Sequence, residues 1–512
     1  MDNVRGCSQS GCPMSQVNRR DFLAAAGALA AGAAVSVVSG GCGGLSTSLF
    51  GEPAIWDETE PLAAPMPKAK IKAAFVRPNV DKYWMGWPGA AYDIAERQRQ
   101  YTKVLRAAAA AQGIELELVS APVADSQGVS ALCESLSSNP PDGTLIVAMC
   151  LHHGHSNFWR HVDTIARNKG PAPMVIFSPM GTSFTSEVRG RRFAGVRKSG
   201  VFVGATQDVE WLATGLKMLN TVHKMKHTRL LIVKGDRTYD RRLEVIGTTL
   251  HYVPVSRFPE ELKKVEVSDR VRAIANYYSK KAERIVEPTR QDILNAAKNY
   301  IVARRLMAAE ECHGISVDCL PLVGQRRIPC GPCVAWSRLN DSGSVGACEA
   351  DWNAAISLRL TSLLFDRPGF MQDPAPNTVN NTLNGAHCSC PTKLAGFDQP
   401  PEPFVLRSHS ESDIGTVTQV LWRPGQKITI MKFQGPKKMI LGTGKVVRNI
   451  NTPPSGGCRT SLEVALDNVP DSRDTAGFHQ LFIYGDLENQ FKAYCELAGI
   501  KVEPLYQPVP VA

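Results

Sequence analysis

Two carboxylates and a tryptophan stand together in the stretch 346–355, at the start of an apolar run with helical spacing. If the helix already includes Glu349, its period of about 100° per residue places Glu349 on the same face as Trp352 and Ile356. If Asp351 instead caps the helix, both carboxylates lie at its positive end, where a bound cation could be shared. The plain alternative is an ordinary helix cap beside a glutamate held in a salt bridge, and the spacing leaves these interpretations open.

Other side chains with ligand or catalytic chemistry are distant in sequence. His479 lies in a strand-like run before the last expected helix, where it is either a ligand or a core residue. Asp318 follows the apolar strand 315–317, at the end of a strand where α/β sheets present functional side chains. His387 and His409 are ambiguous when each is taken singly.

Short apolar runs alternate with helical stretches from residue 70 to about residue 320. This alternation predicts parallel sheets covered by helices. No GxGxxG motif follows any of these strands, so the sequence offers no dinucleotide-binding fingerprint. The expected strands are 71–76, 114–119, 143–149, 174–177, 229–233 and 314–319, and the expected helices include 92–112, 269–281 and 289–307.

From about residue 404 onward, β-rich runs are separated by Pro/Gly turns, and the last expected helix is 486–498. Several short strands at near-regular spacing indicate a small antiparallel barrel or sandwich. The predicted fold class is therefore α/β, with two Rossmann-like parallel-sheet domains followed by a small antiparallel β-barrel. The predicted domains are 70–205, 206–400, which carries the acidic helix start, and 401–512.

Size and composition describe a globular protein of several domains. At 512 residues the chain exceeds the size at which single cores stop growing. Its 43% hydrophobic and 21% charged residues are typical of a folded protein rather than a disordered one. The net charge of +10 includes no long basic run interleaved with aromatic residues, so we predict no nucleic-acid partner.

The N-terminus resembles a targeting segment. A pair of arginines at 19–20 precedes a weakly apolar, Ala/Gly-rich run that begins at Leu23 and is short for a membrane span. This pattern is typical of a twin-arginine signal, which exports folded bacterial proteins. We therefore expect residues 1–45 to engage the export machinery and residues 46–69 to form a linker. The expected location is periplasmic, or membrane-anchored if Cys42 is a lipoprotein site.

The chain has fourteen cysteines, yet a protein exported in the folded state folds in a reducing compartment, so most are expected to be free thiols. Cys330 and Cys333 have the CxxC spacing of redox and zinc sites. A zinc site normally needs a second, compatible pair, and Cys388 and Cys390 are too close to be a standard one. A structural turn is the preferred interpretation, and an exported redox protein or metal hydrolase is the alternative.

Taken together, the order of these motifs resembles the C-terminal part of the L-fucose isomerase and L-arabinose isomerase superfamily, over about residues 329–499. The N-terminal half fits the two α/β domains of that family but carries no motif that identifies it alone. The matching segments are 339–343, 348–352, 370–373, 385–388, and His479 before 484–486.

The resemblance implies a metal-dependent conversion of an aldose to its ketose, with a small-molecule sugar as ligand and a homo-oligomeric assembly. It implies Glu349, Asp351 and His479 as ligands of a divalent metal, commonly Mn²⁺, because the helix-start acid matches Glu349 in the arabinose-type pattern and Asp351 in the fucose-type pattern. Carboxylate and imidazole ligands suit such an ion, which acts as a Lewis acid. A carboxylate then moves a proton between C1 and C2 through an enediol.

Two departures from the family pattern affect the expected site. The arabinose-type histidine that follows the 370–373 segment has only Asn377 in its place. The upstream catalytic carboxylate of the family has no clean match, and Asp318 is the candidate to act as acid or base with Glu349. We expect Asn377, His387 and His409 near the substrate or behind the metal ligands.

Two predicted functions follow from this resemblance. The first is a metal-dependent sugar isomerase. The second is a non-catalytic carbohydrate-binding or scaffold protein that retains the isomerase fold. Export favours the second, because isomerases of this family normally act on intracellular sugars.

Overall fold

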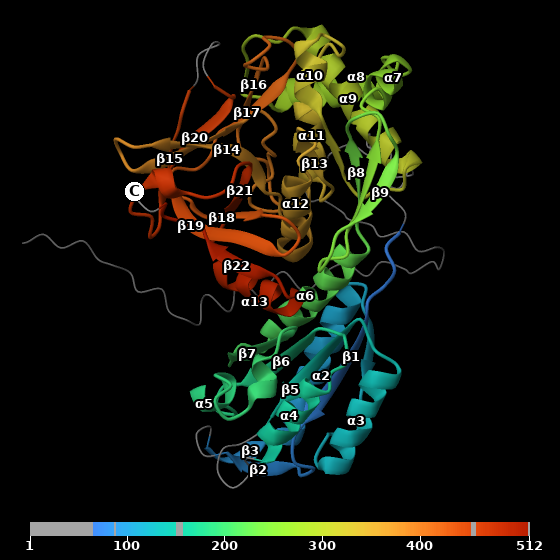
Figure 1. The fold of residues 1–512 in the computed structure, drawn as a ribbon, viewed down its shortest axis with the longest axis vertical. Coiled ribbons are helices and arrows are strands. Elements are labelled where there is room, and N and C mark those ends of the chain that lie inside the picture. Colours follow the sequence, from blue (N-terminus) through green and yellow to red (C-terminus); the bar gives the residue numbers. More distant parts are fainter. Residues whose placement is uncertain (1–64, 86–88, 150–156, 452–456, 510–512) are drawn as a thin grey trace, which may run out of the picture. The chain divides into compact units, whose positions relative to one another are not determined.

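The computed structural model describes residues 65–85, 89–149, 157–451 and 457–509. In this part of the chain, the elements form two α/β sheets, a β-barrel and smaller sheets (Figure 1). The predicted export signal at 1–45 and most of the predicted linker lie outside the described residues. None of the helices in the described ranges combines the length and the apolar character needed to cross a membrane.

The first sheet is parallel throughout and confirms the predicted α/β class. The strands β2 (Lys82–Met85) and β3 (Gly89–Asp93) form a separate antiparallel ribbon. If the remaining strands are numbered 1 to 5 along the chain, the order across the sheet is 2-1-3-4-5, which is typical of doubly wound sheets. The order of the strands is β4 (Glu115–Leu118), β1 (Lys70–Val76), β5 (Gly143–Ala148), β6 (Met174–Pro179) and β7 (Val201–Thr206).

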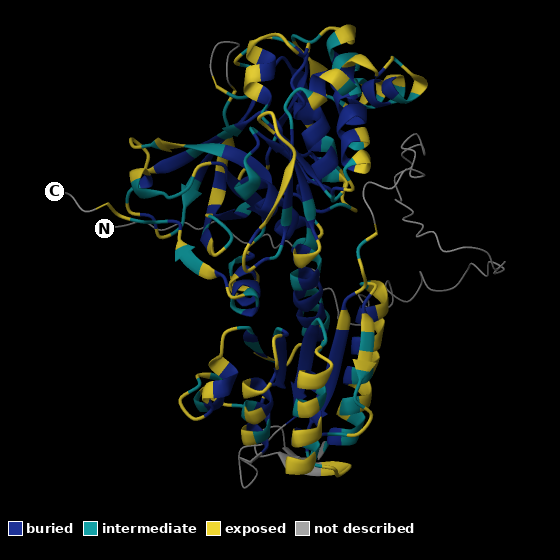
Figure 2. Cartoon of the chain, turned by 45° about the vertical axis from the view of Figure 1, so that its right-hand side comes forward, coloured by how far each residue is buried: buried dark blue, intermediate teal, exposed yellow. Residues whose placement is uncertain are grey.

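Helices cover both faces of this first sheet. On β1, Phe75 joins the core beneath α2 (Ile94–Ala111) and α6 (Trp211–Lys226), whereas its neighbour Val76 joins the core beneath α3 (Ser126–Ser138) and α4 (Asn157–Arg167). Successive side chains of a strand face opposite sides, so such a strand is apolar throughout. Figure 2 shows these strands buried and the outer surfaces of the helices exposed.

The second sheet is smaller and mixed. Its first four strands are parallel and β9 pairs antiparallel with β10. Because two of its strands have only three residues and one edge is antiparallel, a second Rossmann-like domain is not confirmed. The strand order is β13 (Gly346–Cys348), β12 (Ile315–Val317), β8 (Arg229–Val233), β10 (Thr249–Val253) and β9 (Tyr239–Arg242). The helices of this region are α7 (Arg257–Lys263), α8 (Asp269–Lys281), α9 (Arg290–Ala309), α10 (Cys319–Gly324) and α11 (Cys333–Asp341).

Six antiparallel strands close a barrel in the C-terminal region, as the sequence predicts. The last strand in the order below pairs again with the first, which closes the barrel, and β22 (Lys501–Pro504) adds to it in parallel after α13 (Glu488–Ala498). The order is β18 (Lys427–Phe433), β21 (Gln480–Tyr484), β14 (Phe370–Asn377), β15 (Thr382–His387), β20 (Thr460–Leu466) and β19 (Lys438–Asn449).

Two of the barrel strands, β14 and β15, come from the segment that precedes residue 401. Pro374 and Pro376 hide the strand signal of β14, because proline cannot donate to a sheet ladder. The structure accommodates them because β14 pairs with β21 only as far as Gln372, so the prolines lie where β14 has β15 as its one ladder partner. The domain boundaries at residues 205 and 400 stay predictions.

A three-stranded sheet lies beside these larger sheets. Its order is β11 (Arg284–Ile285), β16 (Phe404–Arg407) and β17 (Val417–Val420).

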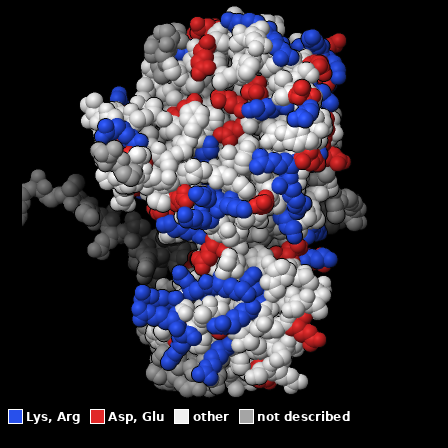
Figure 3. All heavy atoms as spheres, viewed as in Figure 1, with Lys and Arg blue, Asp and Glu red and all other residues white. Residues whose placement is uncertain are grey.

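The positive charge of the chain is concentrated after α5 (Thr185–Val188). Figure 3 shows lysine and arginine side chains gathered over α5 and β7, whereas acidic and basic residues are interspersed over the second sheet and the barrel. The absence of a nucleic-acid partner stays a prediction. The exposed basic residues of the segment after α5 are Arg189, Arg191, Arg192, Arg197 and Lys198.

Helix α12 (Trp352–Phe365) connects the second sheet to the barrel. It contacts β12 and β13 on one side and β18 and β21 on the other (Figure 1). The backbone N–H of Phe433 donates to Ser357 Oγ at 2.9 Å, and that of Gly435 donates to Asn353 Oδ1 at 2.9 Å. These bonds fix the N-terminal half of α12 against the end of β18.

Gly385 on β15 has no room for a side chain, because an added Cβ would lie 2.8 Å from Gln372 Oε1 and closer still to the ring of Phe482. We expect Gly385→Ala to lower the free energy of unfolding by about 1–3 kcal/mol through overpacking. Gly324→Ala is the matched control, since nothing lies within 4 Å of its added Cβ, and should change it by less than about 1 kcal/mol. Urea unfolding measures both variants, and equal stabilities would contradict this packing.

Candidate metal centre

Asp351 is the N-cap of α12, so the structure has the second of the two geometries that the sequence allows. Its Oδ1 accepts hydrogen bonds from the backbone N–H of Asn353 at 2.8 Å and of Ala354 at 3.1 Å. The carboxylate thereby satisfies two of the four N–H groups that a helix start leaves without partners.

Glu349 and Ala350 form a left-handed turn between β13 and α12, with φ of 59° and 51°. A side chain in this conformation costs of order 1–3 kcal/mol, and it persists only where the surroundings enforce it. The backbone N–H of Ala350 donates to Val317 O at 3.1 Å, which fixes the turn to the adjacent strand. The turn brings Glu349 to the histidines of the barrel.

His479 lies directly before β21, also with a positive φ of 54°, and is 4% exposed. Its Nδ1 is 2.8 Å from Asp351 Oδ2. Its Nε2 is 3.4 Å from Glu349 Oε2 and 3.1 Å from Asp373 Oδ1, which comes from β14. Three carboxylates from two separate elements therefore surround one buried imidazole.

His387, the last residue of β15, completes the group. Its Nε2 lies 3.8 Å from Glu349 Oε1, its Nδ1 lies 3.1 Å from Ser389 Oγ, and its ring centre is 5.9 Å from that of His479. One ligand atom from each of Glu349, His387 and His479 lies within 4.8 Å of the others, a spacing that could hold a metal ion. We call these three residues the metal cluster.

The donors of the metal cluster fit a divalent cation. His479 Nε2 and Asp373 Oδ1 are buried and 3.1 Å apart, yet neither has a partner with hydrogen-bond geometry. Buried polar atoms are normally satisfied, and a cation between them would satisfy both. Imidazole and carboxylate donors without thiolate suit ions such as Mn²⁺, Fe²⁺ or Zn²⁺.

Charge interactions hold the metal cluster in defined protonation states when no metal is bound. Burial opposes charge on His479, but Asp351, Asp373 and Glu349 outweigh it and raise the pKa of its imidazole to about 10. The nearby imidazoles of His387 and then His479 lower the pKa of Glu349 to about 2. For His387, burial acts to lower the pKa, but Glu349 raises it above its usual value. Without a metal, the imidazolium of His479 thus supplies the positive charge that a metal ion would otherwise supply among these carboxylates.

Lys432 on β18 also belongs to the site, and the sequence pattern does not predict its role there. It is 7% exposed, and its Nζ lies 2.9 Å from Asp351 Oδ2 and donates to Phe478 O. Burial acts to raise the pKa of Asp351, but His479 and Lys432 hold it well below its usual value. With both oxygens of Asp351 engaged, its geometry is that of a group that orients His479, rather than that of an open ligand.

Three predicted residues are not bonded to the metal cluster in the described part of the chain. Asp318 occupies the N-cap position of α10 at the end of β12, without a side-chain capping bond. Asn377 donates to Glu463 Oε1 at 3.2 Å, and the Nδ1 of His409 lies 3.0 Å from Ser412 Oγ. No hydrogen bond or ion pair within the described ranges joins any of the three to the metal cluster. Their catalytic or binding roles stay predictions, as do those of the residues that converge.

The CxxC segment has structural contacts. Cys330 and Cys333 are buried free thiols. The side-chain amide of Asn299 donates to the carbonyls of Cys330 and Gly331 at 2.8 and 3.1 Å, and the Cys330 thiol accepts from the N–H of Thr416. These hydrogen bonds support the interpretation of the CxxC segment as a structural turn.

Comparison with known proteins supports a sugar isomerase-like function. No family model matches the chain. Over 184 residues, the chain is 27% identical to a sulfoquinovose isomerase of Clostridium sp. (strain MSTE9). The match covers 33% of this chain and 39% of that relative, so the chain spans less than half of the relative's length. The similarity is to a sugar isomerase, the class that the sequence predicts.

Metal affinity should rise with pH, because the pKa of His479 is about 10 without metal and a coordinating imidazole must lose its proton. We expect Mn²⁺ to bind about tenfold more tightly per pH unit between about pH 6 and pH 8, with release of at least one proton. Calorimetric titration in buffers of different ionisation enthalpy measures both quantities. His409→Gln is the control and should retain this slope, whereas an affinity that is independent of pH would contradict a ligand role for His479.

Proposed function

We propose that this protein is a metal-dependent sugar isomerase that interconverts an aldose and a ketose. The observation that carries the proposal is the convergence of Glu349, His387 and His479 from three elements, with Asp373 beside them. The similarity to a sulfoquinovose isomerase over a third of the chain supports the same class. Membership of the L-fucose and L-arabinose isomerase superfamily is part of this proposal.

In this proposal the metal is Mn²⁺, and its protein ligands are the metal cluster and Asp373. When bound, the ion would act as a Lewis acid that polarises the carbonyl and hydroxyl oxygens of the sugar. The resemblance suggests Asp351 as a ligand, but we assign it a different role. Its carboxylate binds Nδ1 of His479 and thereby orients Nε2 toward the ion. Lys432 holds Asp351 in turn.

Proton transfer between C1 and C2 of the sugar is assigned to the carboxylates. Glu349 has a pKa of about 2 in the metal-free site and is therefore ionised, in the form that accepts a proton. Asp373 has a side chain that is 35% exposed, so solvent and substrate can reach it. Asp318 stays a candidate for the second acid, because the register of Val317 with Cys348 places it and Glu349 at the same edge of the second sheet.

The first sugar to test is sulfoquinovose, because the relative is named for it. L-Fucose and L-arabinose are the next candidates, since the sequence resembles their isomerases. The ring of Phe478 is 57% exposed and its centre lies 4.4 Å from that of His479, so it offers an apolar face beside the metal cluster for the carbon skeleton of a sugar.

The proposal also includes location and assembly. Residues 1–45 would direct export, and the protein would act in the periplasm or on a membrane through Cys42. A homo-oligomer is proposed from the resemblance. The N-terminal arginine pair at 19–20 supports the export part of this proposal.

A non-catalytic carbohydrate-binding role is the second candidate function. The observation in its favour is that the family's upstream acid has no clean match, and Asp318, the candidate to replace it, has no described hydrogen bond or ion pair with the metal cluster. Metal and sugar binding without turnover on any of the three sugars would favour this role.

Replacing Glu349 separates the two functions. In the presence of saturating Mn²⁺ we expect ketose formation from one of the three sugars, and a loss of about a thousandfold in kcat for Glu349→Gln, because this change removes both a proton-transfer group and a metal ligand. Asp471→Asn is the matched control, since Asp471 pairs with Arg473 at the surface, and this variant should retain full activity. Turnover that survives in Glu349→Gln would contradict the assigned role.

Replacing Asp351 tests whether it orients His479 or binds the metal. Asn is as good an N-cap as Asp, so Asp351→Asn should leave α12 intact. We expect it to weaken Mn²⁺ binding by about 10–100-fold, which is typical for a group that supports a ligand. Equilibrium dialysis measures this loss, and a loss as large as that of His479→Gln would make Asp351 a ligand.

A further inference from the structure

Arg359, in the middle of α12, is a buried cation with weak partners. It is 8% exposed. Its Nε lies 3.4 Å from Thr228 Oγ1, its Nη1 lies 3.4 Å from Gly343 O, and its Nη2 lies 3.8 Å from Met66 Sδ. Good N–H···O bonds are about 2.9–3.0 Å long, so the two contacts to oxygen are long, and the third is to a thioether, which is a weak acceptor. No carboxylate of the described residues forms an ion pair with this guanidinium.

The surroundings of Arg359 add positive charge rather than neutralise it. Burial alone lowers the pKa of Arg359 to about 10. Burial, and then the charges of Arg359 and Lys217, lower the pKa of Lys224 on the neighbouring helix α6. The acid of this region, Asp366, is exposed and pairs with Lys217. A buried charge is unfavourable unless it is paired, and within the described ranges no carboxylate pairs with this guanidinium.

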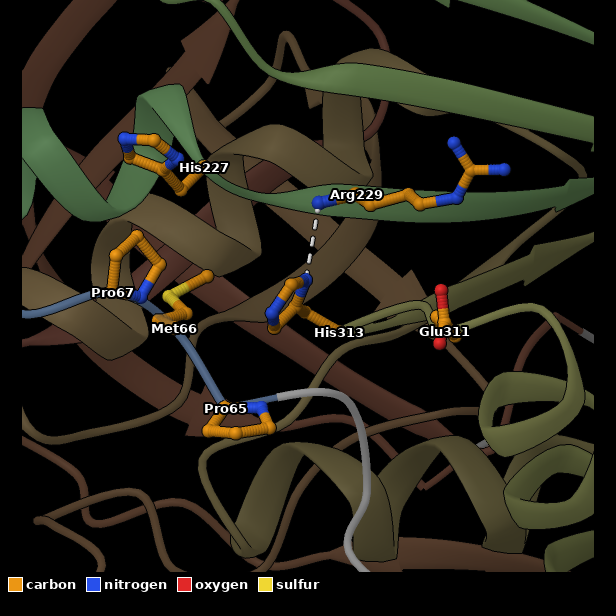
Figure 4. Close-up of a pocket in the computed structure, with 7 residues that line it drawn as sticks. All are labelled: Pro65, Met66, Pro67, His227, Arg229, Glu311 and His313. Atoms are coloured by element: carbon orange, nitrogen blue, oxygen red, sulfur yellow. Dashed lines mark hydrogen bonds between the residues drawn. The ribbon is translucent and has the colours of Figure 1, made fainter.

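A cavity of about 410 Å³ lies one side chain away from Arg359, which is not itself among the lining residues. Met66, whose sulfur touches the guanidinium, is one of its lining residues, and Thr228, the partner of Nε, lies between two others. Figure 4 shows Met66 near the imidazole of His313, while the guanidinium of Arg229 points away. The lining residues are 65–67, His227, Arg229, Glu311 and His313.

The charges around this cavity favour an anion at its inner end. Arg229 is already neutralised, because its Nη1 lies 2.6 Å from Asp240 Oδ2. Glu311, the carboxylate of the lining, is an exposed residue. Arg359 is the buried charge that remains without an anion, and Met66 separates it from the cavity. Planar guanidinium groups recognise oxyanions with paired N–H donors.

We propose that this cavity binds a small oxyanion, such as phosphate, sulfate or a sulfonate, which pairs with Arg359 by displacing the thioether of Met66. The site is separate from the metal cluster, because Arg359 lies eight residues beyond Asp351 on α12, about 12 Å along the helix axis. It therefore stands or fails independently of the isomerase proposal.

The test measures thermal unfolding of the full chain without added metal, so that phosphate has no bound ion to coordinate. Phosphate, sulfate and methanesulfonate are each titrated against chloride at equal ionic strength. We expect at least one of them to raise the melting temperature by about 2 °C or more. The anion that does so identifies the chemical source. A melting temperature that none of the three raises above the chloride control would overturn the proposal.

Arg359→Met gives the sharpest result, because it removes an unpaired buried charge. Its melting temperature in chloride should equal or exceed that of the unsubstituted chain, and its response to the anion should be lost. Arg407→Met is the matched control, since Arg407 is equally buried but pairs with Glu287 at 2.7 Å. It should lower the melting temperature and keep the anion response. An anion response retained in Arg359→Met would overturn the proposal.

Met66→Glu is a second variant, for use if Arg359→Met fails to fold. A carboxylate at this partly exposed position would pair with Arg359 from within the chain. We expect a higher melting temperature in chloride and no further rise with the anion. A variant that still responds to the anion as fully as the unsubstituted chain would show that the anion binds elsewhere.

Discussion

The arrangement of the candidate site depends on the carboxylate of Asp351. One of its oxygens caps α12, and the other meets Lys432 of β18 and the imidazole of His479. Helix, barrel strand and the turn before β21 are thus joined at a single group. Removing one partner from a buried, charged network of this kind is strongly unfavourable, so the three elements are held in one relative position.

This constraint explains why strained backbone persists in the site. Glu349, Ala350 and His479 all have positive φ, at an expense of order 1–3 kcal/mol each. Regular strand geometry would direct the side chains of Glu349 and His479 to the faces of their own sheets. The left-handed turns direct them toward one another, and the ion pairs of His479 with Asp351 and Glu349 stabilise that conformation.

The sequence predicts those parts of the fold and site that depend on local pattern. Several apolar runs of the first sheet and the helix 269–281 are found as expected, because their patterns indicate which faces are buried. The capping role of Asp351 is one of the two geometries that spacing allows. Proline hides β14 from the same reasoning, although its pairing with β15 tolerates both prolines.

The contacts that complete the site are long-range, and local pattern does not contain them. In the sequence, Lys432 is a polar residue in a largely apolar strand. Its burial against Asp351 depends on the closure of the barrel. Asp373 lies in a segment that matches the family, but its distance to His479 depends on the pairing of β14 with β21. His387 likewise lies near Glu349 because β15 ends beside the turn that carries Glu349.

Helix α12 carries two buried charges, and their different environments distinguish structure from binding. Asp351 is matched by a lysine, a histidine and two backbone N–H groups, so its charge is satisfied within the chain. Arg359, on the same helix, has three long contacts and no carboxylate partner in the described residues. Both charges are expensive to bury, and only the first is offset by the fold itself. The charge of Arg359 would be offset by an anion in the nearby cavity. This guanidinium therefore has the chemistry of an anion-binding group.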